Sequence, residues 1–292
     1  MSAAIFYNIW HYIQATGDTD FLLEPGVEMM MEIARFWSSI AHFNPERGRY
    51  EIHGIMGPDE FHEKYPDTDE PGLRNNAYTN VMVAWILDVA GRLLDMLPER
   101  RRSICERIDL TDQEIETWKE MSRKMYVPFH ADGVISQFEG WEDLEELDWD
   151  AYRREYGNIQ RLDRILRAEG KEPDRYKLSK QADTVLLFYL FRQDELKQIF
   201  ERLGYSYTPE TLRKTVLLRC PNLARVHPEL RSVCRDLLGD RSGNLLGAVH
   251  GGIGERRRRR AGWHHGRGHP HGRDGGDAGP GAARLRGRGD SR

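Results

Sequence analysis

The first 126 residues carry a helical pattern of apolar positions. Apolar side chains recur every three or four residues, the spacing of a helix with one buried face, in three successive stretches. These positions are Phe6, Ile9, Trp10 and Ile13, then Met29, Ile33, Phe36 and Trp37, then Val81, Val83, Trp85, Ile86, Val89 and Leu93. Long helices are therefore predicted over residues 1–126.

Turn and capping residues lie between the predicted helices. The stretch TGDTDFLLEPG between the first two helices contains the Gly, Asp and Pro residues typical of a turn. Thr111 or Asp112, with a Glu three positions further on, has the sequence of a capping box and predicts a helix start.

The rest of the chain changes character twice. Residues 127–182 are mostly polar with interspersed aromatics, which favours surface helices and connections over a second core, and ADTVLLFYLF then predicts one more buried helix. The periodicity weakens from Leu217 and is gone past Gly247. Helices without β-alternation indicate an all-α fold, and no fixed repeat supports a solenoid. A ring of helix hairpins, a toroid, is the preferred architecture.

Composition narrows the class of protein. In 292 residues, 39% are hydrophobic and 10% aromatic, which is enough for a sizeable core. The net charge of −4 combines an acidic body with an Arg-rich end. The cysteines Cys105, Cys220 and Cys234 lack CxxC spacing, so neither disulfides nor a zinc ribbon are predicted, and a cytoplasmic location is expected. No apolar run reaches the length of a membrane span.

Reactive side chains concentrate in residues 51–80. Asp59, Glu60, His62 and Glu63 follow a Gly-Pro pair and precede the helix that begins at Ala77, so they are predicted to lie on a loop. Loops on a rigid scaffold are where catalytic groups gather.

General-acid chemistry is one interpretation of this loop. A carboxyl group beside another carboxylate and beside apolar Met56 and Phe61 is expected to have a raised pKa, which suits proton donation near neutral pH. A solvated acidic turn is the alternative, with His62 as a hydrogen-bonded surface histidine. No metal-ligand spacing is found, because His53 and His62 are separated by a Gly-Pro loop.

The loop motifs resemble those of a known family. GPDEFHE followed by NNAYTNVMVAW is similar to the signature of glycoside hydrolase family 65, the maltose, trehalose and kojibiose phosphorylases. Further similar stretches occur in the same order: GDTDFL and EIARFW before it, then QFEGW, YGNIQRLDRILRAEG and RYKLSKQAD. The resemblance covers residues 1–216.

This resemblance implies a partial (α/α)6 barrel and a catalytic residue. Glu60 corresponds to the general acid, and inorganic phosphate, the co-substrate, attacks the anomeric carbon with inversion; no cofactor is implied. Lys180 and Gln181 correspond to the pair that contacts the transferred glucose; otherwise they are a surface pair at a helix N-terminus. A family hydrolase such as an acid trehalase is the nearest alternative. The disaccharide stays open, and full-length members are expected to be homodimers.

The resemblance also implies missing parts. Family members have an N-terminal β-sandwich and a complete barrel, so this chain is expected to be incomplete and inactive alone. End helices of an open half-ring would expose apolar surface, at a cost of roughly 25 cal/mol per Å².

Residues 217–292 are interpreted as a disordered tail read out of frame. When the codons from Leu217 onward are read one nucleotide later, they permit YYDARTSHGSTL, which resembles the family's phosphate-binding stretch. The same shift applied to residues 261–277 permits QGGTTAEGIHMGAMAGT, which resembles its late-barrel motif. One common shift in two separate stretches indicates a frameshift near Thr215 to Leu217.

Two other interpretations concern the tail. Arg256 to Arg260 suit a nucleic-acid-binding arm whose affinity falls with salt, and the histidines His264, His265, His269 and His271 suit metal ions. The frameshift accounts for both features, so we expect no nucleic-acid partner. Because no apolar run has the length of a membrane span, we expect no membrane partner either.

Overall fold

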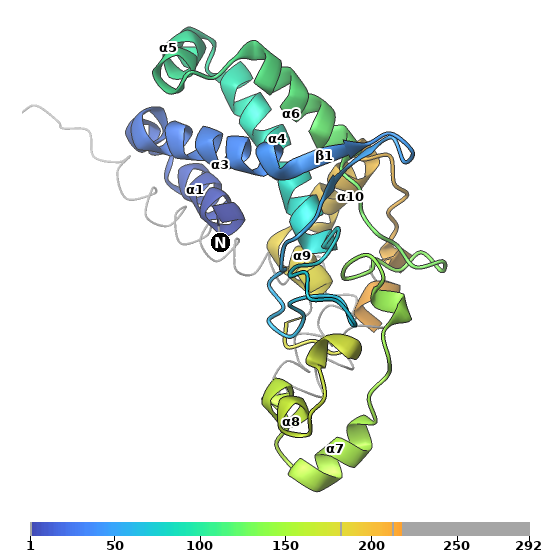
Figure 1. Ribbon diagram of the computed structural model, residues 1–292. Helices are drawn as coiled ribbons and strands as arrows, with labels where there is room; N and C mark the ends of the chain where they lie inside the picture. The colour runs from blue at the N-terminus through green and yellow to red at the C-terminus, as the bar shows by residue number, and fades with distance from the viewer. Residues whose placement is uncertain (1, 182, 212, 218–292) are drawn as a thin grey trace, which may run out of the picture. The chain divides into compact units, whose positions relative to one another are not determined.

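The computed structural model describes residues 2–181, 183–211 and 213–217, which are mostly helical (Figure 1). Its helices are α1 (Ser2–Thr16), α2 (Thr19–Phe21), α3 (Val27–Ile40), α4 (Ala77–Met96), α5 (Pro98–Ile108), α6 (Asp112–Lys124), α7 (Trp149–Tyr156), α8 (Leu162–Ala168), α9 (Asp183–Leu190) and α10 (Gln193–Arg202). Short helical turns are η1 (Leu22–Gly26), η2 (Trp141–Asp143) and η3 (Pro173–Arg175), and the strands are β1 (Ala41–Asn44) and β2 (Arg49–Ile52).

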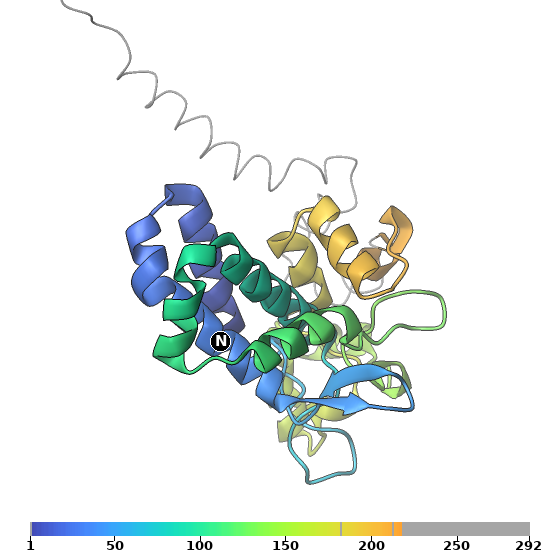
Figure 2. The same cartoon turned by 90° about the horizontal axis from the view of Figure 1, so that it is seen from above.

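Helix α4 is the centre of the main core. It contacts α1, α3, α5, α6 and α9, and most of its residues are buried. Figure 2 shows α4 and α6 side by side. Other helices cover α4 on several faces, so apolar residues occur all around it and not along one stripe only. This explains the near-continuous apolar run VMVAWIL. The helix at Ala77 and the capping box at Thr111, in which Thr111 and Glu114 bond each other's backbone, are confirmed.

The predicted apolar face of α3 is partly wrong. Met29 is 43% exposed and Phe36 49% exposed, whereas Met30, Met31 and Ala34 are fully buried. Consecutive methionines offer two overlapping apolar faces, and periodicity alone cannot choose between them. The packing of α3 against α4 and α1 decides which one is buried.

Two local predictions also need correction. The residues after α3 form an antiparallel hairpin, with Ala41 opposite Ile52 and Asn44 opposite Arg49; the four positions of each strand are too few for a clear alternation. In TGDTDFLLEPG the helix does break at Gly17, whose φ is 68°. Pro25, by contrast, lies inside a π-helical turn that leads directly into α3.

A second core does exist in the polar middle of the chain. Leu147, Trp149, Tyr152 and Leu162 are buried together with Phe61 from the loop after β2. Only surface helices and connections were predicted for residues 127–182, because apolar residues are sparse there. They gather around Phe61, which comes from a distant part of the chain. The second core therefore packs against the loop that carries Glu60.

The buried helix predicted at ADTVLLFYLF is present as α9. The partial (α/α)6 barrel stays a prediction, and the predicted tail lies outside the described residues apart from Leu217. In the part of the chain that the structure describes, no helix has both the length and the apolar character needed to cross a membrane.

Candidate active site

The candidate site lies on the loop of residues 53–76, which joins β2 to α4. At the end of this loop, Asn76 caps α4: its Oδ1 accepts a hydrogen bond from the Thr79 N–H at 2.9 Å, and its Nδ2 donates to Asp183 Oδ2 at 2.7 Å. Gly57 packs against this pair, and a Cβ there would meet Asp183 Oδ2 at 2.0 Å. Only glycine allows this approach, which brings the loop to the start of α9.

Asp59 is a buried anchor of the loop. Its Oδ1 accepts hydrogen bonds from the backbone N–H groups of Lys180 at 3.1 Å and Phe61 at 3.2 Å, and its Oδ2 accepts one from Gln137 Nε2 at 2.8 Å. Its side chain is 3% exposed. Such a carboxylate can be buried because donors surround it. Asp59 thus joins the loop to the segment before α9.

His62 is buried too, which contradicts the alternative interpretation of it as a surface histidine. Its Nε2 lies 2.9 Å from the carbonyl oxygen of Tyr176. A carbonyl can only accept, so Nε2 carries the hydrogen. Nδ1 faces Asp59 Oδ2 at 3.5 Å, and the ring packs edge-on against Phe138 and Trp141. His62 therefore holds the loop in place and is not accessible to a substrate.

Glu60 points the opposite way from Asp59. Its side chain is 65% exposed and contacts Lys180 Nζ at 2.5 Å through Oε2. Gln181 Nε2 lies 3.5 Å from Oε1, at the limit of a hydrogen bond. The structure therefore brings together all three residues singled out from the sequence.

The raised pKa predicted for Glu60 is wrong for this arrangement. The hydrogen bond from the Lys180 ammonium, together with its positive charge, lowers the pKa of Glu60, with smaller contributions from Gln181 and Arg161. The residues expected to raise it face elsewhere: Asp59 points inward, Phe61 is buried in the second core, and Met56 is 58% exposed. In this state Glu60 is an ionised carboxylate.

Gln181 offers an unused acceptor at the site. Its Oε1 is buried and has no hydrogen-bond partner among the residues described. A buried amide oxygen without a partner is costly, and because this oxygen is closed off from solvent, a ligand hydroxyl reaches it only after the side chain moves. The groups that this arrangement presents to solvent are therefore the Glu60 carboxylate and the Lys180 ammonium.

Two further residues, to which no sequence motif gave a role, organise this site. Gln137, which binds Asp59, belongs to the QFEGW stretch. Asp174 precedes RYKLSKQAD, and its Oδ1 accepts hydrogen bonds from the N–H groups of Glu63 and Lys64 at 2.6 and 3.0 Å. QFEGW is one of the stretches similar to the family's motifs, but nothing in its local pattern indicated that Gln137 contacts Asp59.

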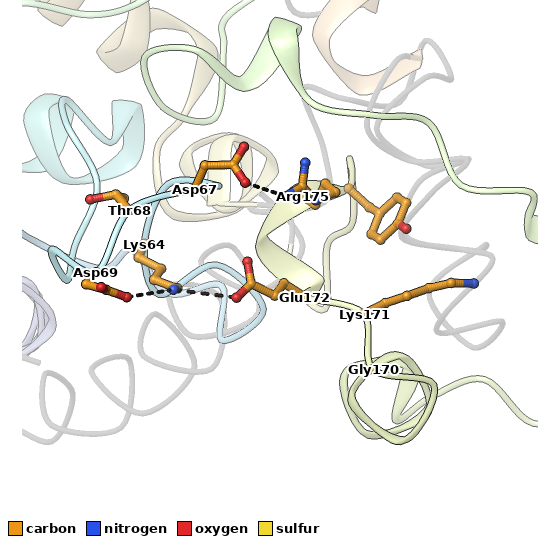
Figure 3. Close-up of a pocket in the computed structure, with 9 residues that line it drawn as sticks. Lys64, Asp67, Thr68, Asp69, Gly170, Lys171, Glu172 and Arg175 are labelled. Carbon is orange, nitrogen blue, oxygen red and sulfur yellow. Dashed lines mark hydrogen bonds and ion pairs between the residues drawn. The ribbon is translucent and has the colours of Figure 1, made fainter.

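A cavity of about 460 Å³ lies beside the loop but does not include Glu60 (Figure 3). Its three cations are already paired: Lys64 with Asp69 and Glu172, Lys171 with Glu169, and Arg175 with Asp67. An anion bound there would have to displace these carboxylates. We therefore place the candidate chemistry at Glu60 and not in this cavity.

A match to the model of the glycosyl hydrolase family 65 central catalytic domain covers residues 1–232. The chain belongs to this family, which includes glycoside phosphorylases and hydrolases.

Individual relatives agree with this assignment. An uncharacterised glycosyl hydrolase of Mycobacterium tuberculosis is 53% identical over 214 residues, 73% of this chain and 16% of the relative. Trehalose 6-phosphate phosphorylase of Lactococcus lactis is 36% identical over 213 residues, 73% of this chain and 26% of the relative. The chain thus spans about a quarter or less of these proteins.

A solved structure of a kojibiose phosphorylase candidate from the human microbiome matches with a TM-score of 0.63 and 22% identity. The match covers 83% of this chain and 31% of that structure. At this identity, the likeness establishes a shared fold.

Proposed function

We propose that the enzyme containing this domain cleaves an α-glucosidic disaccharide by inverting phosphorolysis, with Glu60 as general acid. The observation that carries the proposal is the convergence of Glu60, Lys180 and Gln181, which come from segments 120 residues apart. Glycosidic cleavage needs a carboxyl group beside the leaving oxygen and donors that position the sugar. The three side chains supply both.

The reaction balances with one protein carboxyl group. Glu60 gives its proton to the glycosidic oxygen as the bond from that oxygen to the anomeric carbon breaks. A phosphate oxygen forms the new bond from the opposite face, and the products are β-glucose 1-phosphate and the released sugar. Phosphate is already an anionic nucleophile, so positioning replaces the second, basic carboxylate that an inverting hydrolase requires.

Glu60 must be protonated to act as the acid, and the Lys180 contact opposes this. A sugar hydroxyl that accepts a hydrogen bond from Lys180 Nζ draws the ammonium away, and the sugar ring excludes water. Both changes favour the protonated carboxyl group. Substrate binding is therefore the step that prepares Glu60 for proton transfer.

Phosphorolysis is preferred over hydrolysis because relatives at 36% and 37% identity are named trehalose 6-phosphate phosphorylase and kojibiose phosphorylase. The relative at 53% identity is named a glycosyl hydrolase, which keeps hydrolysis as the second candidate. Phosphate dependence separates the two.

The test uses the protein made from the complete gene. Maltose, trehalose, kojibiose and trehalose 6-phosphate are each incubated with and without phosphate, and sugar phosphate and free glucose are measured. We expect phosphate-dependent cleavage of one of them, and Glu60→Gln reduces kcat by roughly 10²–10⁴-fold, the usual contribution of a general acid. Glu63→Gln, a nearby exposed carboxylate, is the matched control and keeps activity. Cleavage at equal rate without phosphate supports the hydrolase instead.

We also propose that residues 217–292 are translated out of frame. Support comes from the two family-like stretches that one common nucleotide shift recovers. The family match runs to residue 232, past the proposed shift, which favours natural divergence as the alternative. The nucleotide sequence from codon 210 to codon 277 decides: if the reading one nucleotide later lacks both stretches, the frameshift is rejected.

A further inference from the structure

Three side chains with metal-binding atoms converge on one face of the β1–β2 hairpin. His42 is the cross-strand partner of Glu51, and His53 follows Glu51 by two residues, which places it on the same face of extended chain. Nε2 of His53 lies 2.9 Å from Oε2 of Glu51, and Nε2 of His42 lies 3.9 Å from it. All three potential ligand atoms lie within 4.8 Å of one another.

Glu51 is oriented by its own partners. Its side chain is 4% exposed, and its Oε1 accepts hydrogen bonds from Arg47 Nη1 and Asn44 Nδ2, each at 3.0 Å. This leaves Oε2 facing the two imidazoles. Contacts that orient a ligand from outside are a regular feature of metal sites, because they hold the donor atom in place before the ion binds.

A simple hydrogen bond between His53 and Glu51 explains only part of this arrangement. The second imidazole, His42, lies with its ring centroid 4.3 Å from that of His53, and its Nε2 is turned toward the same carboxylate oxygen. Both imidazole side chains are at least 39% exposed, so an ion can reach them from solvent and His42 has room to adjust. The positive charge of Arg47 lies close to these side chains and would repel a cation. Glu139 pairs with Arg47 at 2.7 Å and offsets that charge.

We propose that His42, Glu51 and His53 bind a divalent transition-metal ion, for which two imidazoles and one carboxylate best match Zn²⁺. Three protein ligands leave the fourth tetrahedral position to water. The ion links β1 to His53, the first residue of the loop that carries Glu60. This site is independent of the proposed reaction, in which no metal takes part.

The test measures Zn²⁺ binding to the full chain, purified without a histidine tag, by isothermal titration calorimetry. Because the six tail histidines can also bind metal, they are first replaced in a background variant, H227Q/H250Q/H264Q/H265Q/H269Q/H271Q. We expect this variant to bind one Zn²⁺ per chain. Adding H42Q/H53Q abolishes that binding, and adding E51Q weakens it at least tenfold. His130→Gln, outside the hairpin, is the matched control and leaves binding unchanged.

The proposal is overturned if the background variant binds no Zn²⁺ or if H42Q/H53Q leaves its binding unchanged. Far-UV circular dichroism checks that each variant keeps its helices. Should H42Q/H53Q lose them, X-ray absorption of the Zn²⁺-loaded background variant decides. A first shell with two imidazoles supports the site, and a shell with none or four contradicts it.

Discussion

Helix α4 and the loop of residues 53–76 are adjacent in the chain but are held in place by different forces. The buried side chains of α4 are mostly apolar, among them Ile86 and Leu87 at 0% exposure. Within the loop, Asp59 and His62 are buried by hydrogen bonds to segments beyond residue 136. The helix therefore depends on apolar burial, whereas the loop adds distant polar partners to the apolar burial of Phe61.

This difference has a consequence for function. A loop held by a few directional contacts keeps one side chain, Glu60, exposed while its neighbour Asp59 is buried. Two adjacent carboxylates thereby acquire separate tasks, one that anchors the loop and one that faces a ligand.

The largest expected effect is on the apolar side of the comparison. Ile86→Ala removes a fully buried side chain from α4 and lowers the free energy of unfolding by about 2–5 kcal/mol, because a cavity remains. Met96→Ala, at the exposed end of the same helix, changes it by less than about 0.5 kcal/mol. Guanidinium unfolding measures both variants. Equal effects would show that α4 is not the centre of the core.

A smaller effect is expected for the loop anchor. Asp59→Asn keeps the shape but places an amide N–H₂ against donors, so the free energy of unfolding falls by about 1–3 kcal/mol. Hydrogen exchange at the Phe61 and Lys180 amides should accelerate, since both donate to Asp59. Glu60→Gln, the exposed neighbour, serves as control and stays within about 0.5 kcal/mol. If Asp59→Asn leaves the free energy of unfolding unchanged, Asp59 does not anchor the loop.

The smallest effect on stability, and the most specific one, concerns the charge of Glu60. Carbon-13 NMR of its carboxyl group should report a pKa below the usual range, and Lys180→Met should raise that pKa. A lowered folded-state pKa stabilises the fold above the carboxyl's unfolded pKa, and this contribution is lost as pH falls through the folded value. Because Glu60 is exposed, solvent screening keeps it small.

Lys177→Met is the control for this titration, because Lys177 pairs with Glu146 and not with Glu60. It should leave the pKa of Glu60 where it is. An ordinary pKa for Glu60 in the unmodified chain would refute the Lys180 contact.

Several features were predictable because they depend on neighbours in sequence. The start of α4 after Asn76 and the capping box at Thr111 are local hydrogen-bond patterns, so they could be inferred from a few residues. The hairpin was missed, since its strands are short and their pairing is between residues, such as Ala41 and Ile52, whose alternation is weak. The second core was missed because Phe61 joins it from a distance.

The sequence by itself determined the helical character of the chain, the starts of helices α4 and α6, and, through family motifs, the choice of Glu60, Lys180 and Gln181. Tertiary structure decided what those residues experience. The ammonium that lowers the pKa of Glu60 lies 120 residues away in sequence, and His42 meets Glu51 only through strand pairing. Helical periodicity is a local property, whereas the charge state and ligand geometry of a site depend on contacts that form only when distant segments pack together.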